Sequence, residues 1–82
     1  MNWIFDEGHI FSKNEDDELL AEVTYSYIDQ ETVDINHVYV NPSLRGKGIA
    51  GEAMETAVSY LVKKGYKITA TCPYGKQWLE KQ

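Results

Sequence analysis

The residues best suited to chemistry lie in one short stretch, where Arg45 precedes the segment GKGIAG at positions 46–51. This segment satisfies the pattern G-x-G-x-x-G, and a run with helical periodicity begins within it at Ile49. A helix N-terminus exposes unpaired backbone N–H groups and a partial positive charge, which stabilise an anion by about 0.3–2 kcal/mol. Glycines let a phosphate approach the backbone because they lack a Cβ atom. The stretch therefore predicts a phosphate-binding turn, and a pyrophosphate suits it.

Two nucleotide-binding interpretations of this turn fail on its context. A dinucleotide site needs its first glycine close behind a strand and an acidic residue about 20 positions after the motif. Here NPSLR separates the preceding strand from the glycines, and Thr71 and Cys72 occupy the positions where the acid is needed. The G-x-x-x-x-G-K-[ST] spacing of a nucleoside triphosphate loop is also missing. A phosphate remains indicated, but neither a nicotinamide cofactor nor a nucleoside triphosphate.

Three strands are predicted ahead of the turn, because apolar and polar residues alternate there with a period of two. They cover HIFSK at 9–13, LLAEVTYSYI at 19–28 and TVDINHVYV at 32–40. The polar segment NEDDE predicts a hairpin loop between the first two strands. Asn41 and Pro42 end the third strand, since proline has no N–H to donate to a ladder and restricts the residue before it.

The third of these strands changes parity along its length. Val33 and Ile35 fall on one face under strict alternation, whereas Val38 and Val40 fall on the other. The change occurs around His37 and predicts a β-bulge or a strand that leaves its neighbour.

A long helix, a strand and a short helix are predicted after the turn. Residues 49–64 carry one wide apolar stripe, as expected of a helix lying on a sheet, and Gly65 suits a left-handed C-terminal cap. KITATC at 67–72 alternates as a strand, which the length of the connection makes parallel to its partner. Pro73 opens a short helix that carries Trp78. The predicted fold class is α+β: an antiparallel meander, a strand-helix-strand unit and a short C-terminal helix.

Composition bounds the class of protein. With 82 residues, 43% hydrophobic, the chain is expected to form a single domain over residues 1–82 whose stability is marginal, as a monomer or weak dimer. No apolar run reaches the roughly 18 residues of a membrane span and no signal sequence opens the chain, so we expect a cytoplasmic protein without membrane contact. The single cysteine, Cys72, excludes an internal disulfide, and no zinc-ligand spacing occurs, so no metal is expected.

Charge is distributed unevenly between the two halves of the chain. The overall formal charge is −5, but residues 1–36 contribute −9 and residues 37–82 contribute +4. This asymmetry indicates different partners for the two halves, with two solvated faces of different charge as the alternative.

The segment VNPSLRGKGIA at 40–50 resembles the acyl-coenzyme A binding motif of the GCN5-related N-acetyltransferase superfamily, whose core is [Q/R]-x-x-G-x-[G/A]. Arg45, Gly48 and Ala50 fill its three defined positions. From INHVYV to TCPY the chain looks like the short single-domain members of that superfamily, whereas the N-terminal strands match only in outline. The motif is fairly specific where strand, glycines, helix and TCPY occur together.

The resemblance implies an abbreviated form of the superfamily's fold and acetyl-coenzyme A, or coenzyme A, as the cofactor. Its pyrophosphate would lie on the backbone of residues 45–50, and its pantetheine arm where the parallel strands around Val40 and Ala70 separate. The cofactor-binding residues expected on this basis are Val40, Arg45, Gly46, Lys47, Gly48, Ile49, Ala50, Cys72, Tyr74 and Lys76.

The chain also departs from the family pattern. It ends soon after Cys72, so the later strands that help to form the acceptor pocket in full-length members are expected to be absent, and the family's late tyrosine acid has no counterpart. Gly75 stands where short relatives carry a larger residue, which predicts a looser last helix.

Two side chains are candidates for catalysis. An imidazole has an unperturbed pKa of about 6.5, which suits a general base, and His37 matches a histidine common in the short relatives; a hydrogen-bonded sheet residue is the alternative. Cys72 follows a strand and precedes a helix N-terminus, where thiolates form more easily. We expect its thiol beside the thioester as an acetyl relay, as an acid for the leaving thiolate, or as a packing group. Backbone N–H groups near Tyr39 and Val40 are the expected oxyanion donors.

Two classes of function remain open. The first is an N-acetyltransferase acting on a small-molecule or protein amine, for which the acidic first half favours a cationic acceptor. The second is a non-catalytic coenzyme A binding or regulatory module. Nucleic-acid binding is not expected, because interleaved aromatic residues and an overall basic charge are lacking.

Overall fold

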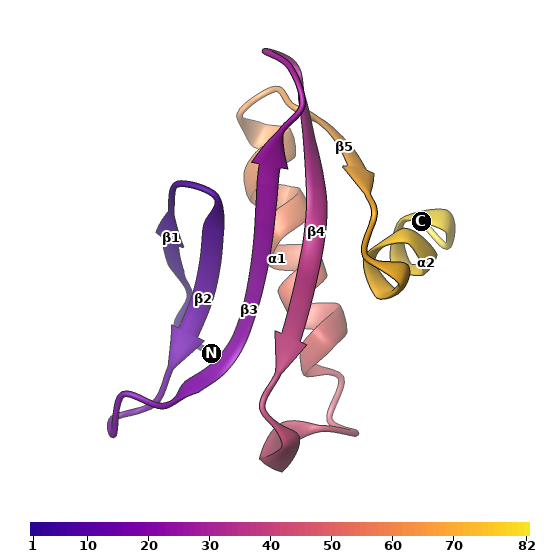
Figure 1. Cartoon of the computed structure of the whole chain (residues 1–82). Helices are drawn as coiled ribbons and strands as arrows, with labels where there is room; N and C mark the ends of the chain where they lie inside the picture. Colours follow the sequence, from indigo (N-terminus) through magenta and orange to yellow (C-terminus); the bar gives the residue numbers. More distant parts are fainter.

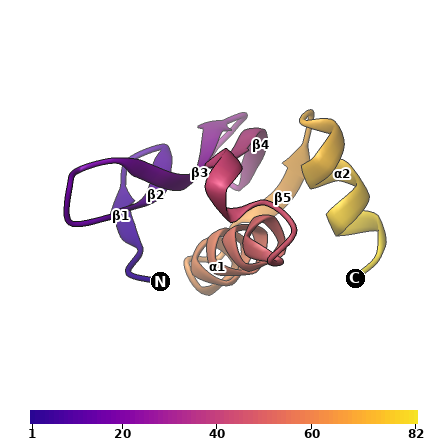
Figure 2. The ribbon, with the colours of Figure 1, turned by 90° about the horizontal axis from the view of Figure 1, so that it is seen from below.

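Five strands form one sheet whose spatial order follows the chain, and a long helix covers one of its faces (Figures 1 and 2). The computed structural model describes residues 1–82. Its elements are β1 (Ile4–Asp6), β2 (His9–Lys13), β3 (Leu19–Tyr27), β4 (Thr32–Val40), the 3-10 turn η1 (Pro42–Leu44), α1 (Ile49–Lys63), β5 (Lys67–Ala70) and α2 (Pro73–Glu80). The first four strands pair antiparallel and β5 pairs parallel with β4. The predicted α+β class and element order are confirmed.

The sequence did not indicate the 3-10 turn η1, nor did it indicate the strand β1. It pairs with β2 through a tight turn in which Gly8 adopts a φ of 74°. The turn is held from the neighbouring strand, because the Tyr25 N–H donates to the Gly8 carbonyl at 3.0 Å. All three residues of β1 are exposed, so no alternation of apolar and polar residues could reveal the strand.

The predicted β-bulge lies where β4 passes His37. The register with β3 shifts there, so that Asn36 is an extra residue. The prediction that Ile35 lies on the opposite face from Val38 and Val40 is wrong, because the extra residue restores parity. All three side chains lie opposite buried residues of β3, and cross-strand neighbours share a face.

The core lies between the sheet and α1 (Figure 2). The helix contributes Ala53, Met54, Ala57 and Leu61, all buried, as its apolar stripe predicts. The sheet contributes Ile10, Val23, Tyr25, Val33 and Ile35. Gly65 follows the helix with a φ of 89°, which confirms the predicted left-handed cap. No helix covers the other face of the sheet, which we call the open face.

The parallel pairing of β4 with β5 is short. It runs from Thr32 to Ile35 on β4, and the N–H groups of Thr71 and Cys72 then both donate to the Ile35 carbonyl, at 3.1 and 3.3 Å. Beyond this point β4 continues without a partner strand on that side, and the chain turns away into α2 (Figure 1). The two strands therefore separate after Ile35, as the resemblance implied for the region between Val40 and Ala70.

The helix α2 packs closely on the end of the sheet through Gly75, its buried residue. A Cβ atom placed on Gly75 would lie 3.3 Å from the Cβ of Ala70, 3.5 Å from Cγ2 of Ile35 and 3.7 Å from Cε of Met54. Glycine thus permits a close approach, and the looser helix predicted from this residue is not what the packing shows. Neither helix of the structure has the length and apolar character needed to cross a membrane.

Candidate functional site

The turn between β4 and α1 is anchored at its start by Asn41. Its N–H donates to the Leu20 carbonyl at 2.8 Å, and its side-chain Nδ2 donates to the Leu19 carbonyl at 3.2 Å. Its Oδ1 accepts from both the N–H and the hydroxyl of Ser43, at 3.0 and 2.9 Å. These four hydrogen bonds fix η1 to β3, so the glycines that follow start from a defined position.

The glycines of the turn form a cradle of backbone. Gly46 and Gly48 have φ values of 83° and 76°, which side chains rarely adopt, and a Cβ atom on either would meet no atom within 4 Å. Gly48 is the N-cap of α1 but has no side chain to cap it, and the first bond into the helix runs from the Glu52 N–H to the Gly48 carbonyl at 3.1 Å. The N–H groups of the first helical turn therefore lack partners within the helix. Open space, free donors and the helix dipole together fit a pyrophosphate.

The charges around the cradle are compatible with an anion. The cationic side chains of Arg45 and Lys47 are exposed in the turn itself. The acidic residue of the first helical turn, Glu52, is engaged elsewhere, because its Oε2 accepts from Nε1 of Trp3 at 3.2 Å and lies 3.8 Å from the N-terminal ammonium of Met1. Its carboxylate is thus held toward the N-terminal segment.

A cavity of about 150 Å³ opens beside this cradle. It is lined by Val40, Leu44, Arg45, Gly46, Gly48, Ile49, Ala50, Gly51 and Tyr74. Seven of the ten residues predicted to bind the cofactor are among them, whereas Lys47, Cys72 and Lys76 are not. The end of β4, the glycine turn, the first residues of α1 and Tyr74 of α2 meet at this cavity. The roles of these residues in cofactor binding stay predictions.

Two lining residues were missed from the sequence. Leu44 is an apolar residue placed directly before the basic turn, which is a detectable but unspecific signal. Gly51 closes the GKGIAG segment, and a methyl group there would lie 3.7 Å from the Tyr74 hydroxyl and 3.9 Å from Nε1 of Trp78. This third glycine therefore keeps space between α1 and α2, a role that only the packing of the two helices reveals.

After Ile35 the strand β5 no longer pairs with β4, so one edge of β4 has no partner strand; we call the space beside this edge, between the end of β4 and the end of β5, the gap. Opposed residues in an antiparallel ladder alternate between pairs that exchange hydrogen bonds and pairs whose N–H groups point away. Because the Asn41 N–H donates to β3, the Val40 N–H is directed to the edge that faces the gap, and that of Tyr39 is directed back to β3. Of the two predicted oxyanion donors, only Val40 therefore faces the gap.

Cys72 lies at the point where β5 gives way to α2. It is half-buried, it is the N-cap of α2, and its carbonyl accepts from the Lys76 N–H at 2.9 Å. The thiol does not line the 150 Å³ cavity, whereas Tyr74, two residues later, does. The expected position of Cys72 beside a thioester stays a prediction.

His37 lies on the open face of the sheet, at the bulge. Its side chain is 54% exposed, and its Nε2 lies 3.7 Å from Oε2 of Glu22 on β3. The other oxygen of that carboxylate, Oε1, lies 2.6 Å from Nε2 of His9 on β2. One carboxylate therefore faces two imidazoles, an arrangement that the sequence alone did not suggest.

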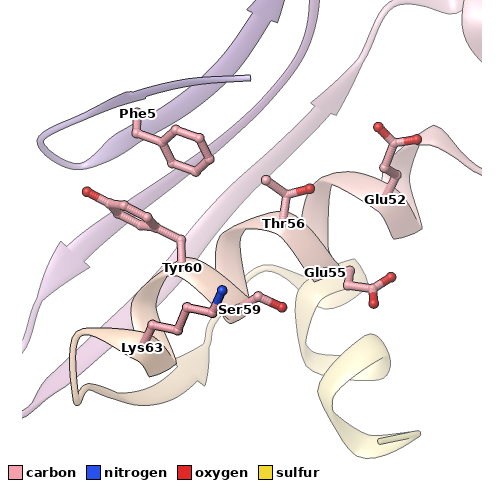
Figure 3. Close-up of a pocket in the computed structure, with 7 residues that line it drawn as sticks. All are labelled: Phe5, Glu52, Glu55, Thr56, Ser59, Tyr60 and Lys63. Atoms are coloured by element: carbon pink, nitrogen blue, oxygen red, sulfur yellow. The ribbon is translucent and has the colours of Figure 1, made fainter. Parts of the chain in front are cut away.

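A larger and shallower concavity, of about 400 Å³, lies between β1 and α1 (Figure 3). The rings of Phe5 and Tyr60 pack together there with centroids 4.6 Å apart, and Glu52 and Glu55 project from the helix. Two carboxylates beside a single cation, Lys63, disfavour a phosphate, and no glycine of the turn lines the concavity. Its greater volume therefore does not make it the cofactor site.

Comparison with known proteins identifies the family. A family model described as GCN5-related N-acetyl-transferase matches residues 10–82. Protein NATD1 from Xenopus tropicalis is 32% identical over 60 residues, which cover 73% of this chain and 55% of that protein. Human Protein NATD1 is 30% identical over 60 residues, covering 73% and 53%. The chain belongs to the GCN5-related N-acetyltransferase family, and its matched segment spans about half the length of these curated relatives.

Solved structures share the fold. The solution structure of a GCN5-like protein from Staphylococcus aureus superposes with a TM-score of 0.79 at 28% identity, covering 98% of this chain and 78% of that one. A GNAT family acetyltransferase from Elizabethkingia anophelis, solved with acetyl-CoA bound, gives a TM-score of 0.69 at 19% identity, covering 89% and 50%. The five-stranded sheet with two helices is thus the GNAT acetyltransferase fold.

Proposed function

We propose that this chain binds acetyl-coenzyme A and transfers the acetyl group to a cationic amine. The observation that carries the proposal is the glycine cradle at the N-terminus of α1, next to the gap between β4 and β5. Membership of the family and the acetyl-CoA-bound relative with the same fold support the choice of cofactor. The cofactor supplies an activated acyl group. The overall reaction converts an ammonium and a thioester into an amide, a thiol and one proton.

In this proposal the residues of the chain divide the work between binding and proton transfer. The backbone of residues 45–50 holds the pyrophosphate, with Arg45 and Lys47 as nearby cations. The Val40 N–H is the hydrogen-bond donor at the gap. His37 takes a proton from the acceptor ammonium, since only the neutral amine is nucleophilic.

Acidic side chains on the open face support a cationic acceptor. Glu22 and Asp34 stand on either side of the bulge, on the open face of β3 and β4. The Asp34 carboxylate is held at the start of the gap by the hydroxyls of Thr69 and Thr71, at 2.8 and 2.7 Å. An acceptor that approaches from this face meets fixed negative charge, whereas the cradle carries the positive charge that suits the cofactor.

Salt is expected to separate cationic from neutral acceptors. At saturating acetyl-coenzyme A, raising NaCl from about 0.05 to 0.5 M should increase the KM for a dicationic amine several-fold, because charges more than a few ångströms apart are screened. The KM for a neutral aromatic amine should change little. A steady-state series at four salt concentrations measures both, and a preference for anionic amines would contradict the cationic acceptor.

The direct test of the function is an acceptor screen. The protein is incubated with acetyl-coenzyme A and a panel of polyamines, amino acids and lysine peptides, while free thiol and the mass of each amine are followed. Transfer to at least one amine, above the non-enzymatic rate, is expected. Binding of coenzyme A without transfer to any of them would instead favour the non-catalytic module.

Replacement of Cys72 by alanine is expected to distinguish the roles of the thiol. If the thiol relays the acetyl group, Cys72→Ala removes transfer and any acetyl adduct on the protein but leaves coenzyme A binding nearly unchanged, since the cradle lies elsewhere. If it only packs, transfer persists with a small loss of stability. Mass spectrometry of the intact protein after incubation with acetyl-coenzyme A measures the adduct, and Cys72→Ser is the control for cavity formation.

A further inference from the structure

Glu22 occupies the centre of a small cluster on the open face. Its neighbours along β3, Ala21 and Val23, are fully buried, so strand alternation directs Glu22 to the open face. Its side chain is only 20% exposed, and each oxygen of its carboxylate faces a different imidazole. A carboxylate this enclosed on a polar face, between two histidines, has a defined orientation.

The bulge in β4 delivers one of these imidazoles. Ile35 faces the core, so in an unbroken strand His37, two residues later, would face the core as well. The extra residue at Asn36 reverses this, and His37 instead lies opposite Thr24 on the open face. The same irregularity thus returns the following valines to the core and brings the His37 Nε2 to 3.7 Å from Glu22.

His9 holds the carboxylate from the other side. Its Nε2 lies 2.6 Å from Oε1 of Glu22, and its ring stacks on Phe11 with centroids 4.3 Å apart. The same Phe11 ring also contacts Lys13, whose Nζ lies 5.7 Å from the centre of the ring. The imidazole of His9 therefore has little freedom, and Glu22 is fixed through it.

We propose that Glu22 is the positioning residue for His37 in the acetyl transfer proposed above, on which this inference rests. At 3.7 Å the contact between Nε2 of His37 and Glu22 is a charge contact and not a hydrogen bond, and the negative charge favours the tautomer with the proton on Nε2, which leaves Nδ1 as the base. The acceptor ammonium gives its proton to Nδ1, and the resulting imidazolium is stabilised by the negative charge of Glu22. The proton then passes to water, since His37 is more than half exposed. His9 takes no proton from the acceptor and orients the carboxylate.

Glu22→Gln is the principal test, because glutamine keeps the shape and removes the charge. At saturating acetyl-coenzyme A and amine, kcat is expected to fall at least about tenfold, a part of the 10²–10⁴ that a general base supplies. The KM for acetyl-coenzyme A should not change. Glu55→Gln on α1, on the other side of the sheet, makes the same change of charge and should keep full activity. Glu22→Asp retains the charge but shortens the reach, and an intermediate rate is expected.

The conservative variant separates positioning from a structural role. Glu22→Asp keeps the negative charge beside His37 and Glu22→Gln does not, so a positioning role predicts that kcat recovers in part in Glu22→Asp while the KM for acetyl-coenzyme A stays unchanged in both variants. Equal losses of kcat in the two variants would reduce Glu22 to a structural residue.

A double-mutant cycle completes the test. If Glu22 acts through His37, the combined Glu22→Gln and His37→Asn variant is no slower than His37→Asn alone. The proposal for Glu22 is overturned if the losses in kcat of the two single variants multiply in the double variant, or if Glu22→Gln is fully active. Neither result contradicts the proposed acetyl transfer itself. A wild-type chain that binds coenzyme A but acetylates no amine overturns the proposed function, and Glu22's role with it. Melting temperatures of all variants exclude loss of folding as the cause.

Discussion

Replacing Gly48 with valine is expected to abolish the stabilisation of this chain by acetyl-coenzyme A. In the wild type, ligand at 100 times its dissociation constant adds about 2.7 kcal/mol, which raises the melting temperature of a domain this small by roughly 10–20 °C. A branched side chain at Gly48 occupies the open space of the cradle and opposes its left-handed φ of 76°. Thermal melting with and without ligand measures the loss, and ATP and NADH should shift the wild type much less.

Gly65 offers a matched control for this substitution. It also has a left-handed φ, of 89°, with no atom within 4 Å of an added Cβ, but it lies at the other end of α1. Both Gly48→Val and Gly65→Val should lose about 1–2 kcal/mol of stability from backbone strain. Only Gly48→Val should lose the response to acetyl-coenzyme A. An equal response in both variants would place the cofactor away from the cradle.

Replacing Gly75 with leucine is expected to detach α2 from the sheet. An added Cβ already lies 3.3 Å from Ala70, and the remaining atoms of leucine have no space between Ile35 and Met54. Overpacking of this kind costs about 1–3 kcal/mol, so the midpoint of urea unfolding should fall accordingly. Because Tyr74 belongs to the same helix and lines the cavity, binding of acetyl-coenzyme A should weaken as well.

The control for Gly75→Leu is Gln77→Leu, which introduces the same residue at an exposed position of α2. It should leave both stability and coenzyme A binding close to the wild type. If Gly75→Leu unfolded at the wild-type midpoint and bound the cofactor normally, α2 would be able to move without consequence. The packing role assigned to Gly75 would then be wrong.

Periodicity and turn chemistry were sufficient for most of the fold. The alternation in β2, β3 and β4 and the apolar stripe of α1 depend on burial on one face, and burial on one face leaves a direct trace in the sequence. The strand β1 leaves no such trace, because Ile4, Phe5 and Asp6 are all exposed. The break in the alternation of apolar residues revealed the bulge in β4, but it assigned Val38 to the wrong face of the sheet. An inserted residue and a strand that changes face break the alternation in the same way.

The candidate site could be predicted only where it is local in sequence. The turn from Arg45 to Ala50 is continuous, so its glycines and the following helix identify it together. Gly51 lines the cavity because α2 returns to α1, and Glu22 meets His9 and His37 because of the registers of β2, β3 and β4. Contacts of this kind depend on strand register and helix packing, which no single segment specifies.

The order of the sheet has a consequence for how the chain folds. From β1 to β4 each strand pairs with the one that follows it directly, so the loops to be closed are short and the meander is expected to form early. The pairing of β4 with β5 must wait until residues 41–66, including all of α1, have been placed. The cavity is complete only after β5 has paired with β4, because Tyr74, one of its lining residues, follows β5 in the chain. We therefore expect amide hydrogens of β5 and α2 to exchange faster than those of β3 and β4, and the cofactor to slow that exchange by binding only the fully closed chain.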